Sequence, residues 1–142
     1  MSTHPGRLPI QSVLSAAQQG IAKAEELGKS FTIVVVDDGG NQQAVVRMDG
    51  APLGSLQVAN DKAYTAVAFK RPTDKWFDVL ENDAVLGRGA LAGIDRLVAF
   101  GGGLPIAVEG EVVAAVGVSG AHYTDDMQVA EAVAAAFGEQ GQ

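Results

Sequence analysis

Residues 31–48 of the chain read FTIVVVDDGGNQQAVVRM and carry its clearest structural signal. Phe31 to Val36 is a run of mostly β-branched residues, which is typical of a buried strand. Residues 37–41 have the composition of a tight turn, and Gln43 to Met48 follows with the pattern of a returning strand. The stretch therefore predicts a β-hairpin, whose two strands pair in antiparallel fashion.

Helical patterns lie on both sides of this hairpin. Between Pro9 and Gly28, apolar residues recur at the 3.6-residue spacing of an amphipathic helix, at Val13, Leu14, Ala17, Ile21 and Ala24. The Ala-rich stretch from Leu53 to Phe69 predicts a second helix, one side of which holds Ala59, Ala63, Ala66 and Val67. Pro72 ends this helix, because proline cannot continue the hydrogen-bond ladder.

The second half of the chain is expected to complete the sheet. Residues 73–96 predict only short helical turns over the core, and Trp76 and Phe77 are core or interface residues or the lining of a flat apolar cavity. Strands are expected at Leu97 to Phe100, Leu104 to Val108 and Val112 to Ser119. With its helices separated from hairpin-linked strands, the chain predicts an α+β fold with a five-stranded antiparallel sheet flanked by helices.

A last helix is predicted after the final strand. Thr124 is placed to cap it, Asp125 and Asp126 suit the positive end of its dipole, and Gly138 is placed to close it. The 142 residues suit one domain that covers residues 1–142, with residues 1–7 as a flexible tail.

Composition narrows the function classes. The formal net charge of −7 argues against nucleic acid as a partner, and the absence of cysteine excludes disulfides and thiolate chemistry. No apolar run approaches the ~18 residues of a membrane span, and the first residues lack the apolar core of a secretory signal. We therefore expect a cytoplasmic protein that does not associate with membranes.

The junction between the last strand and the last helix is the strongest candidate site. It reads Ser119-Gly120-Ala121-His122-Tyr123, and such junctions hold ligands on backbone N–H groups. The His122 imidazole could ligate haem iron or donate a proton, and the Tyr123 phenolate could ligate iron. The alternative for His122 is an ordinary surface histidine. Ser119 has no convincing base beside it and is a poor nucleophile.

Charged residues elsewhere offer further candidates. Arg47 could grip a carboxylate with its fork, or pair with Asp49 or Asp37. Lys62 could be a cation in a pocket or a solvated surface charge. Asp38 could move a proton, or Asp37-Asp38 could only shape the turn. The glycines at 101–103 lack the Lys-Ser/Thr of a phosphate loop, so turns and packing are their simpler role.

Taken in order, these motifs resemble the GlcG/HbpS-like family, also called the haem-degrading domain family. The matching blocks run from about residue 10 to 137: Val36–Gly40, Arg47–Asp49, Lys62-Ala63, Lys70–Thr73, Gly102–Ile106, Gly117–Gly120 and Asp126 with Val129-Ala130. The resemblance implies a profilin-like fold and homo-oligomers. Some relatives bind haem, and one branch is the C-terminal domain of PduO-type proteins. The expected ligand-binding residues are Arg47, Lys62, Gly102, Gly103, Ser119, Gly120, His122 and Tyr123.

Three functions follow from these observations. The first is a small-ligand-binding protein that holds haem as a cytoplasmic homo-oligomer, with His122 or Tyr123 on the iron and Arg47 and Lys62 near the propionates. The second is an enzyme or accessory protein for a small organic acid or aldehyde, in which Arg47 or Lys62 holds the carboxylate and His122 or Asp38 is the catalytic candidate. The third is an assembly module whose small residues serve packing alone. No metal besides haem iron is expected.

Overall fold

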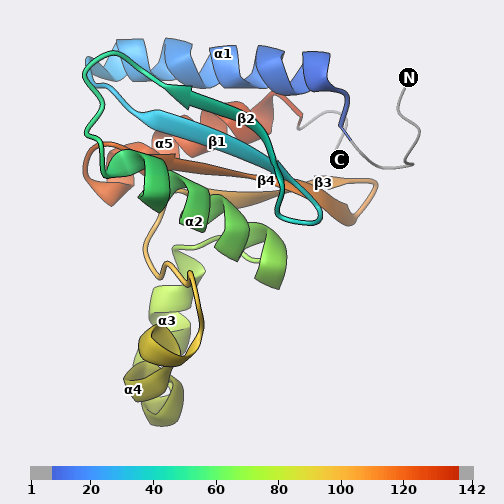
Figure 1. Cartoon of the computed structure of the whole chain (residues 1–142). Coiled ribbons are helices and arrows are strands. Elements are labelled where there is room, and N and C mark those ends of the chain that lie inside the picture. The colour runs from blue at the N-terminus through green and yellow to red at the C-terminus, as the bar shows by residue number, and fades with distance from the viewer. Residues whose placement is uncertain (1–7, 138–142) are drawn as a thin grey trace.

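The computed structural model describes residues 8–137 of the chain. Along the sequence it contains α1 (Ile10–Leu27), β1 (Thr32–Asp37), β2 (Gln42–Arg47), α2 (Ser55–Phe69), α3 (Lys75–Glu81), α4 (Ala84–Gly93), β3 (Gly103–Val108), β4 (Glu111–Ser119) and α5 (Tyr123–Ala135). The strands form one antiparallel sheet in the order β2-β1-β4-β3 (Figure 1). The expected tail at residues 1–7 and the expected helix end at Gly138 lie outside the described residues.

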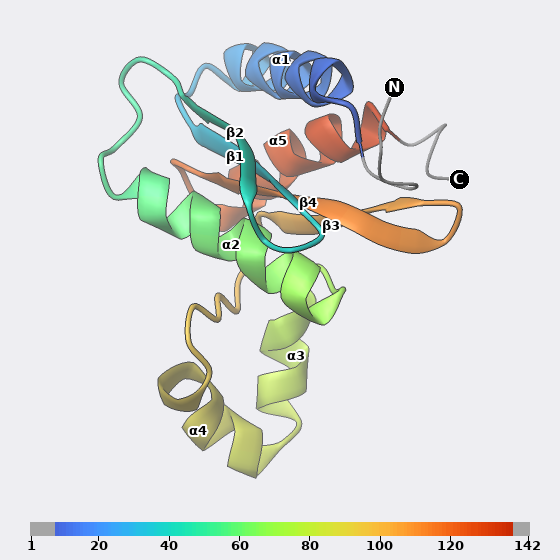
Figure 2. The same ribbon diagram turned by 45° about the vertical axis from the view of Figure 1, so that its right-hand side comes forward.

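Three layers form the body of the molecule. In Figures 1 and 2, α2 covers one face of the sheet while α1 and α5 lie side by side on the other. The hairpin prediction is confirmed, and every residue of β1 is buried. Ile33 and Val35 join the core beneath α1 and α5, whereas Val34 and Val36 join the core beneath α2. A strand buried on both faces explains why its residues 33–36 are all apolar rather than alternating with polar ones.

Small residues bring α2 unusually close to the sheet. The predicted stripe Ala59, Ala63 and Ala66 is completely buried. Opposite it, a Cβ built on Gly117 of β4 would lie 2.0 Å from the Ala59 carbonyl oxygen and 2.5 Å from the Ala63 nitrogen. Only glycine permits this approach of helix backbone to strand backbone. On α1, by contrast, Leu14 was predicted on the buried stripe but is 43% exposed.

The expected fifth strand is absent from the described residues. Leu97 to Phe100 pairs with no strand, so the prediction of five strands is wrong and the sheet has four. The reason is a side chain of α2 that takes the backbone groups of this segment. The Val98 N–H donates to Thr65 Oγ1 over 3.1 Å, and Thr65 Oγ1 donates to the Arg96 carbonyl over 2.8 Å. The α+β class is confirmed.

Helices α3 and α4 form what we call the arm, residues 75–93. It was predicted as short helical turns over the core, but it extends away from the sheet below α2 (Figure 2). Trp76 is its largest buried side chain and packs edge-on against Phe69 at a centroid distance of 5.1 Å. Phe77, Val85 and Leu91 are 59%, 81% and 60% exposed. The arm therefore presents apolar side chains to its surroundings.

Candidate functional site

The sheet gathers most of the predicted ligand residues at one end, which we call the site end. Thr32, at the start of β1, pairs with Arg47 of β2 on one side and Ser119 of β4 on the other. At the same end the Val118 N–H donates to the Gly102 carbonyl, just before β3 begins. Strand pairing alone thus brings together residues as far apart in the sequence as Thr32 and Ser119, which are 87 residues apart.

Lys62 lies beneath this end and is completely buried. Its Nζ donates to the Val118 carbonyl over 2.8 Å and to Asp126 Oδ2 over 2.9 Å. The Asp126 carboxylate is 3% exposed, and its Oδ1 accepts the Ala121 N–H. The interpretation of Lys62 as a solvated surface charge is therefore wrong, because the ammonium fastens the end of β4 to α5.

Burial acts on both members of this pair. Desolvation lowers the pKa of Lys62, and the charge and hydrogen bond of Asp126 offset part of that effect. Desolvation likewise raises the pKa of Asp126, against the opposing charge and hydrogen bond of Lys62. The charge of each group thus offsets part of the desolvation that the other suffers on burial.

Glycines and one aromatic ring close the remaining sides of Lys62. A Cβ on Gly102, whose φ is +127°, would lie 2.6 Å from Nζ, and one on Gly103 would lie 2.5 Å from the Lys62 carbonyl oxygen. The Phe100 ring, half exposed, has its centroid 4.9 Å from Nζ. Gly102 and Gly103 thus pack against lysine, in agreement with the packing role that the sequence favoured for these glycines.

Arg47 is held by its own loop. Its Nε and Nη2 donate to the Ala51 carbonyl oxygen over 3.1 and 2.8 Å. Neither of the acids proposed as its partners is the acceptor in these bonds. The guanidinium therefore closes the loop of residues 47–51, and Nη1 is the nitrogen without an acceptor among residues 8–137.

His122 and Tyr123 stand exposed at the start of α5. The helix begins at Tyr123, so its N-cap is His122 and the prediction that Thr124 caps it is wrong. His122 Nδ1 accepts the Thr124 N–H over 3.3 Å and lies 2.9 Å from Thr124 Oγ1. The two aromatic rings are 4.3 Å apart between centroids. This capping leaves Nε2 as the imidazole nitrogen available to a ligand.

Asp38 lies at the opposite end of the sheet. It is exposed in the hairpin after β1, where the Asp37 carboxylate accepts the N–H groups of Gly39 and Asn41. That geometry confirms the turn-shaping role for Asp37. A strand of six residues spans about 20 Å, so the structure separates Asp38 from His122 rather than joining them in one site.

Sequence reasoning missed two charged groups. Asp126 stood in a recognised motif, but its acidic neighbourhood suggested only a helix-dipole role. Arg96 carried no motif; its Nε donates to Asp61 Oδ1 over 2.8 Å, and its guanidinium carbon lies 3.9 Å from the Tyr64 ring centroid. A Lys or Arg near a distant carboxylate leaves no local pattern, so periodicity could not have found either pair.

The remaining surface offers little metal chemistry. No group of three His, Cys, Asp or Glu able to hold a metal ion occurs within residues 8–137.

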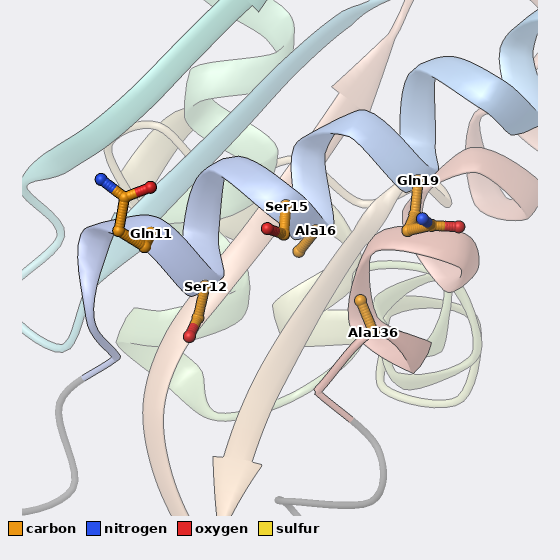
Figure 3. A pocket seen from close by; sticks show the side chains of 6 residues that line it. All are labelled: Gln11, Ser12, Ser15, Ala16, Gln19 and Ala136. Atoms are coloured by element: carbon orange, nitrogen blue, oxygen red, sulfur yellow. The ribbon is translucent and has the colours of Figure 1, made fainter.

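Along α1 a groove of about 470 Å³ is lined by Gln11, Ser12, Ser15, Ala16, Gln19 and Ala136 (Figure 3). These side chains carry no charge and supply hydrogen bonds only. In the same described range, no helix is long and apolar enough to cross a membrane.

Family comparison agrees with the motifs. The family model described as "Haem degrading protein HbpS-like" matches residues 8–135. The chain belongs to the HbpS-like family. The resemblance drawn from the ordered motifs is thereby confirmed.

This HbpS-like chain is similar to three proteins over most of its length. An uncharacterized 15.0 kDa protein from the dhaT-dhaS intergenic region of Citrobacter freundii is 39% identical over 132 residues, 93% of each chain. Protein GlcG of Escherichia coli is 34% identical over 108 residues, which cover 76% of this chain and 75% of GlcG. The solved PduOC:heme complex is 29% identical with a TM-score of 0.84, covering 92% of this chain and 94% of that one.

Proposed function

We propose that this HbpS-like protein binds haem, as a cytoplasmic homo-oligomer, at the exposed His122–Tyr123 pair. The observation that carries the proposal is this pair itself, an imidazole and a phenol with ring centroids 4.3 Å apart at the start of α5. The similar PduOC chain is described in complex with haem, which supports the same ligand here.

The donor set fits the group. A porphyrin supplies four nitrogens to its iron, so one protein ligand suffices, and both histidine and tyrosinate serve as axial ligands. Ligation through His122 Nε2 requires Nδ1 to carry the proton. Nδ1–H can then donate to Thr124 Oγ1, while the bond from the Thr124 N–H is lost. The N-cap would thus exchange one hydrogen-bond pattern for another when His122 takes the iron.

The expected propionate contacts divide. Lys62 is committed to Val118 and Asp126 inside the molecule, so it does not serve a propionate. Arg47 is exposed and keeps Nη1 outside its bonds to Ala51, so it remains the proposed cationic contact. Bound haem would supply redox chemistry at its iron, and the chain would position and shield it.

A haemin titration followed by absorbance tests this site. We expect a saturable, stoichiometric Soret shift in the unmodified protein that His122→Ala or Tyr123→Phe alters. Tyr64→Phe is the matched control, because Tyr64 is the other tyrosine of the chain and lies against Arg96. A weak, non-saturating rise that is identical in all variants would contradict the proposal.

Assembly is the second part of the proposal, and the arm is the surface we assign to it. Two helices of 7 and 10 residues are too short to persist alone in water, and Phe77 and Val85 lie open on them. Trp76 Nε1 is buried without an acceptor among the described residues. A protein that covers these apolar side chains has to be available whenever the chain folds. A second copy of the same chain meets that requirement.

Light scattering coupled to size exclusion tests the assembly. We expect Val85→Asp to lower the oligomer mass to that of a smaller species, because it places a charge within an apolar interface. Leu53→Asp is the control, since Leu53 is 74% exposed outside the arm. An unchanged oligomer in Val85→Asp, or a monomeric unmodified protein, would contradict it.

A small organic acid or aldehyde as ligand remains the alternative function. It requires a cation that can grip a carboxylate with two parallel N–H groups. Lys62 is buried against Asp126, and Arg47 keeps only Nη1 outside its bonds to Ala51, which allows a single contact to a propionate but not a two-point grip. The alternative therefore depends on a cation elsewhere in the fold.

A further inference from the structure

A cavity of about 350 Å³ lies between α2 and the segment that leads from α4 towards β3. Gln57 and Asp61 line it from α2, Leu91 from the end of α4, and Asp95, Arg96 and Leu97 from the connecting segment. Its volume is at the lower end of the range for small-molecule sites, about 300–1,000 Å³. The cavity lies apart from the His122–Tyr123 pair, on the face of α2 that faces the arm.

The backbone conformation of Arg96 in this cavity is strained and is held by hydrogen bonds. Its backbone has a φ of +64°, a left-handed conformation that favours glycine and costs a residue with a side chain about 1 kcal/mol. The Thr65 hydroxyl holds this turn from both sides, through the Arg96 carbonyl and the Val98 N–H. Residues kept in such conformations concentrate at functional sites.

The guanidinium is oriented but only partly used. Its Nε donates to Asp61 Oδ1 over 2.8 Å, and Gln57 Nε2 donates to Asp61 Oδ2. The Tyr64 ring supports its plane at 3.9 Å. Nη1 and Nη2 have no acceptor among residues 8–137, and the Arg96 side chain is 32% exposed. The outer edge of the fork is thus held in place by three groups of α2 without being occupied.

We propose that this cavity binds a small organic monocarboxylate, gripped by Nη1 and Nη2 of Arg96. Two parallel N–H groups match the two oxygens of a carboxylate. Asp61 pairs with Arg96 and Asp95 also lines the cavity, so these two carboxylates and the net charge of −7 repel a dianion such as phosphate more strongly than a monocarboxylate. Leu91 and Leu97 form the apolar part of a lining that is otherwise mostly polar, which suits a ligand with only a short alkyl group.

An NMR titration of the ¹⁵N-labelled full-length protein with sodium lactate and sodium acetate tests the site. We expect saturable shifts of the amides of residues 57–61 and 91–98. Propionamide, which is similar in size to lactate but neutral, and inorganic phosphate should leave these amides unshifted at constant ionic strength. Saturable shifts with phosphate equal to those with lactate would overturn the monocarboxylate assignment.

Three variants locate the grip. Arg96→Lys keeps the charge without the fork, and we expect affinity to fall at least about tenfold. Arg96→Gly should stay folded, because glycine adopts the left-handed turn without strain, and should bind nothing. Arg47→Gln removes a guanidinium elsewhere and should bind lactate as the unmodified protein does. Shifts that persist in Arg96→Gly, or that Arg47→Gln abolishes, would overturn the proposal.

The outcome is independent of haem. Arg96→Gly should leave the haemin titration unchanged, and His122→Ala should leave the lactate shifts unchanged. No saturable shift with either carboxylate in the folded, unmodified protein would refute the Arg96 site while leaving the haem proposal standing.

Discussion

The body and the arm of this molecule differ in how tightly their side chains are packed and buried. In the body, α2 lies so close to β4 that Gly117 has no room for a methyl group, and a lysine is enclosed without access to water. In the arm, Val85 is 81% exposed and Gly89 has no neighbour within 4 Å of a built Cβ. The two regions share one chain and similar contents of glycine and alanine.

The difference between body and arm shows that glycine and alanine have different structural effects in different surroundings. On α2 they allow backbone to approach backbone, which makes the body intolerant of added atoms. On α4 the glycines at 89 and 93 face open space and only weaken the helix. The body is therefore complete by itself, whereas the arm depends on what covers it. Substitutions at matched positions should separate the two regions clearly.

The largest effect is expected at the buried charge pair of the body. Lys62→Met leaves Asp126 buried without its cation, so the free energy of unfolding should fall by about 3–5 kcal/mol. Urea unfolding monitored by circular dichroism measures this loss. The double variant Lys62→Met/Asp126→Leu should recover most of it, since no charge then remains unpaired. A single variant as stable as the unmodified protein would show that Asp126 reaches water.

Crowding at Gly117 should rank next. Gly117→Ala places a methyl group against the Ala59 carbonyl and the Ala63 nitrogen, both backbone atoms that cannot rotate away. We expect a loss of about 3 kcal/mol in urea unfolding, at the upper end for overpacking. A neutral result would mean that α2 can lift from the sheet, and would remove the contrast with the arm.

The same buried pair should give stability a pH dependence. Because burial raises the pKa of Asp126, the folded state binds more protons than the unfolded state above pH 3.8, and stability from this group falls as pH rises through its folded pKa. Because burial lowers the pKa of Lys62, the unfolded state binds more protons below pH 10.5, and stability rises as pH rises through that window.

The Lys62–Asp126 pair therefore contributes least to stability between the two folded pKa values. Measured against Lys62→Met/Asp126→Leu, the unmodified protein should be relatively least stable at a pH between 3.8 and 10.5. The difference should shift in its favour as pH approaches 3.8 or 10.5. A difference that does not vary with pH would contradict the raised and lowered pKa values.

The smallest effect is expected in the arm. Gly89→Ala adds a methyl group in open space inside α4 and should stabilise that helix by about 0.5–1 kcal/mol. Hydrogen exchange of the arm amides measures the local gain, with no change expected at β4. A loss of stability would show that another chain packs against Gly89, which would itself locate the interface.

Local chemistry determined much of this protein. The β-branched run and the DDGGN turn specified the hairpin, and the alanine spacing specified the buried face of α2. These signals operate within a few residues, so they survive in the sequence without knowledge of the rest of the fold. The order of motifs also identified the family correctly.

Only the tertiary structure decided which groups the charged side chains contact. Lys62 meets Val118 and Asp126 across 56 and 64 residues of sequence, and Arg96 meets Asp61 across 35. It also decided that Val98 bonds to Thr65 instead of joining the sheet. A periodic pattern reports which face of an element is apolar, but the partner of a polar group is set by distances between elements. Local sequence patterns thus predicted most helices and strands, whereas the role of each of these cations depended on contacts between distant elements.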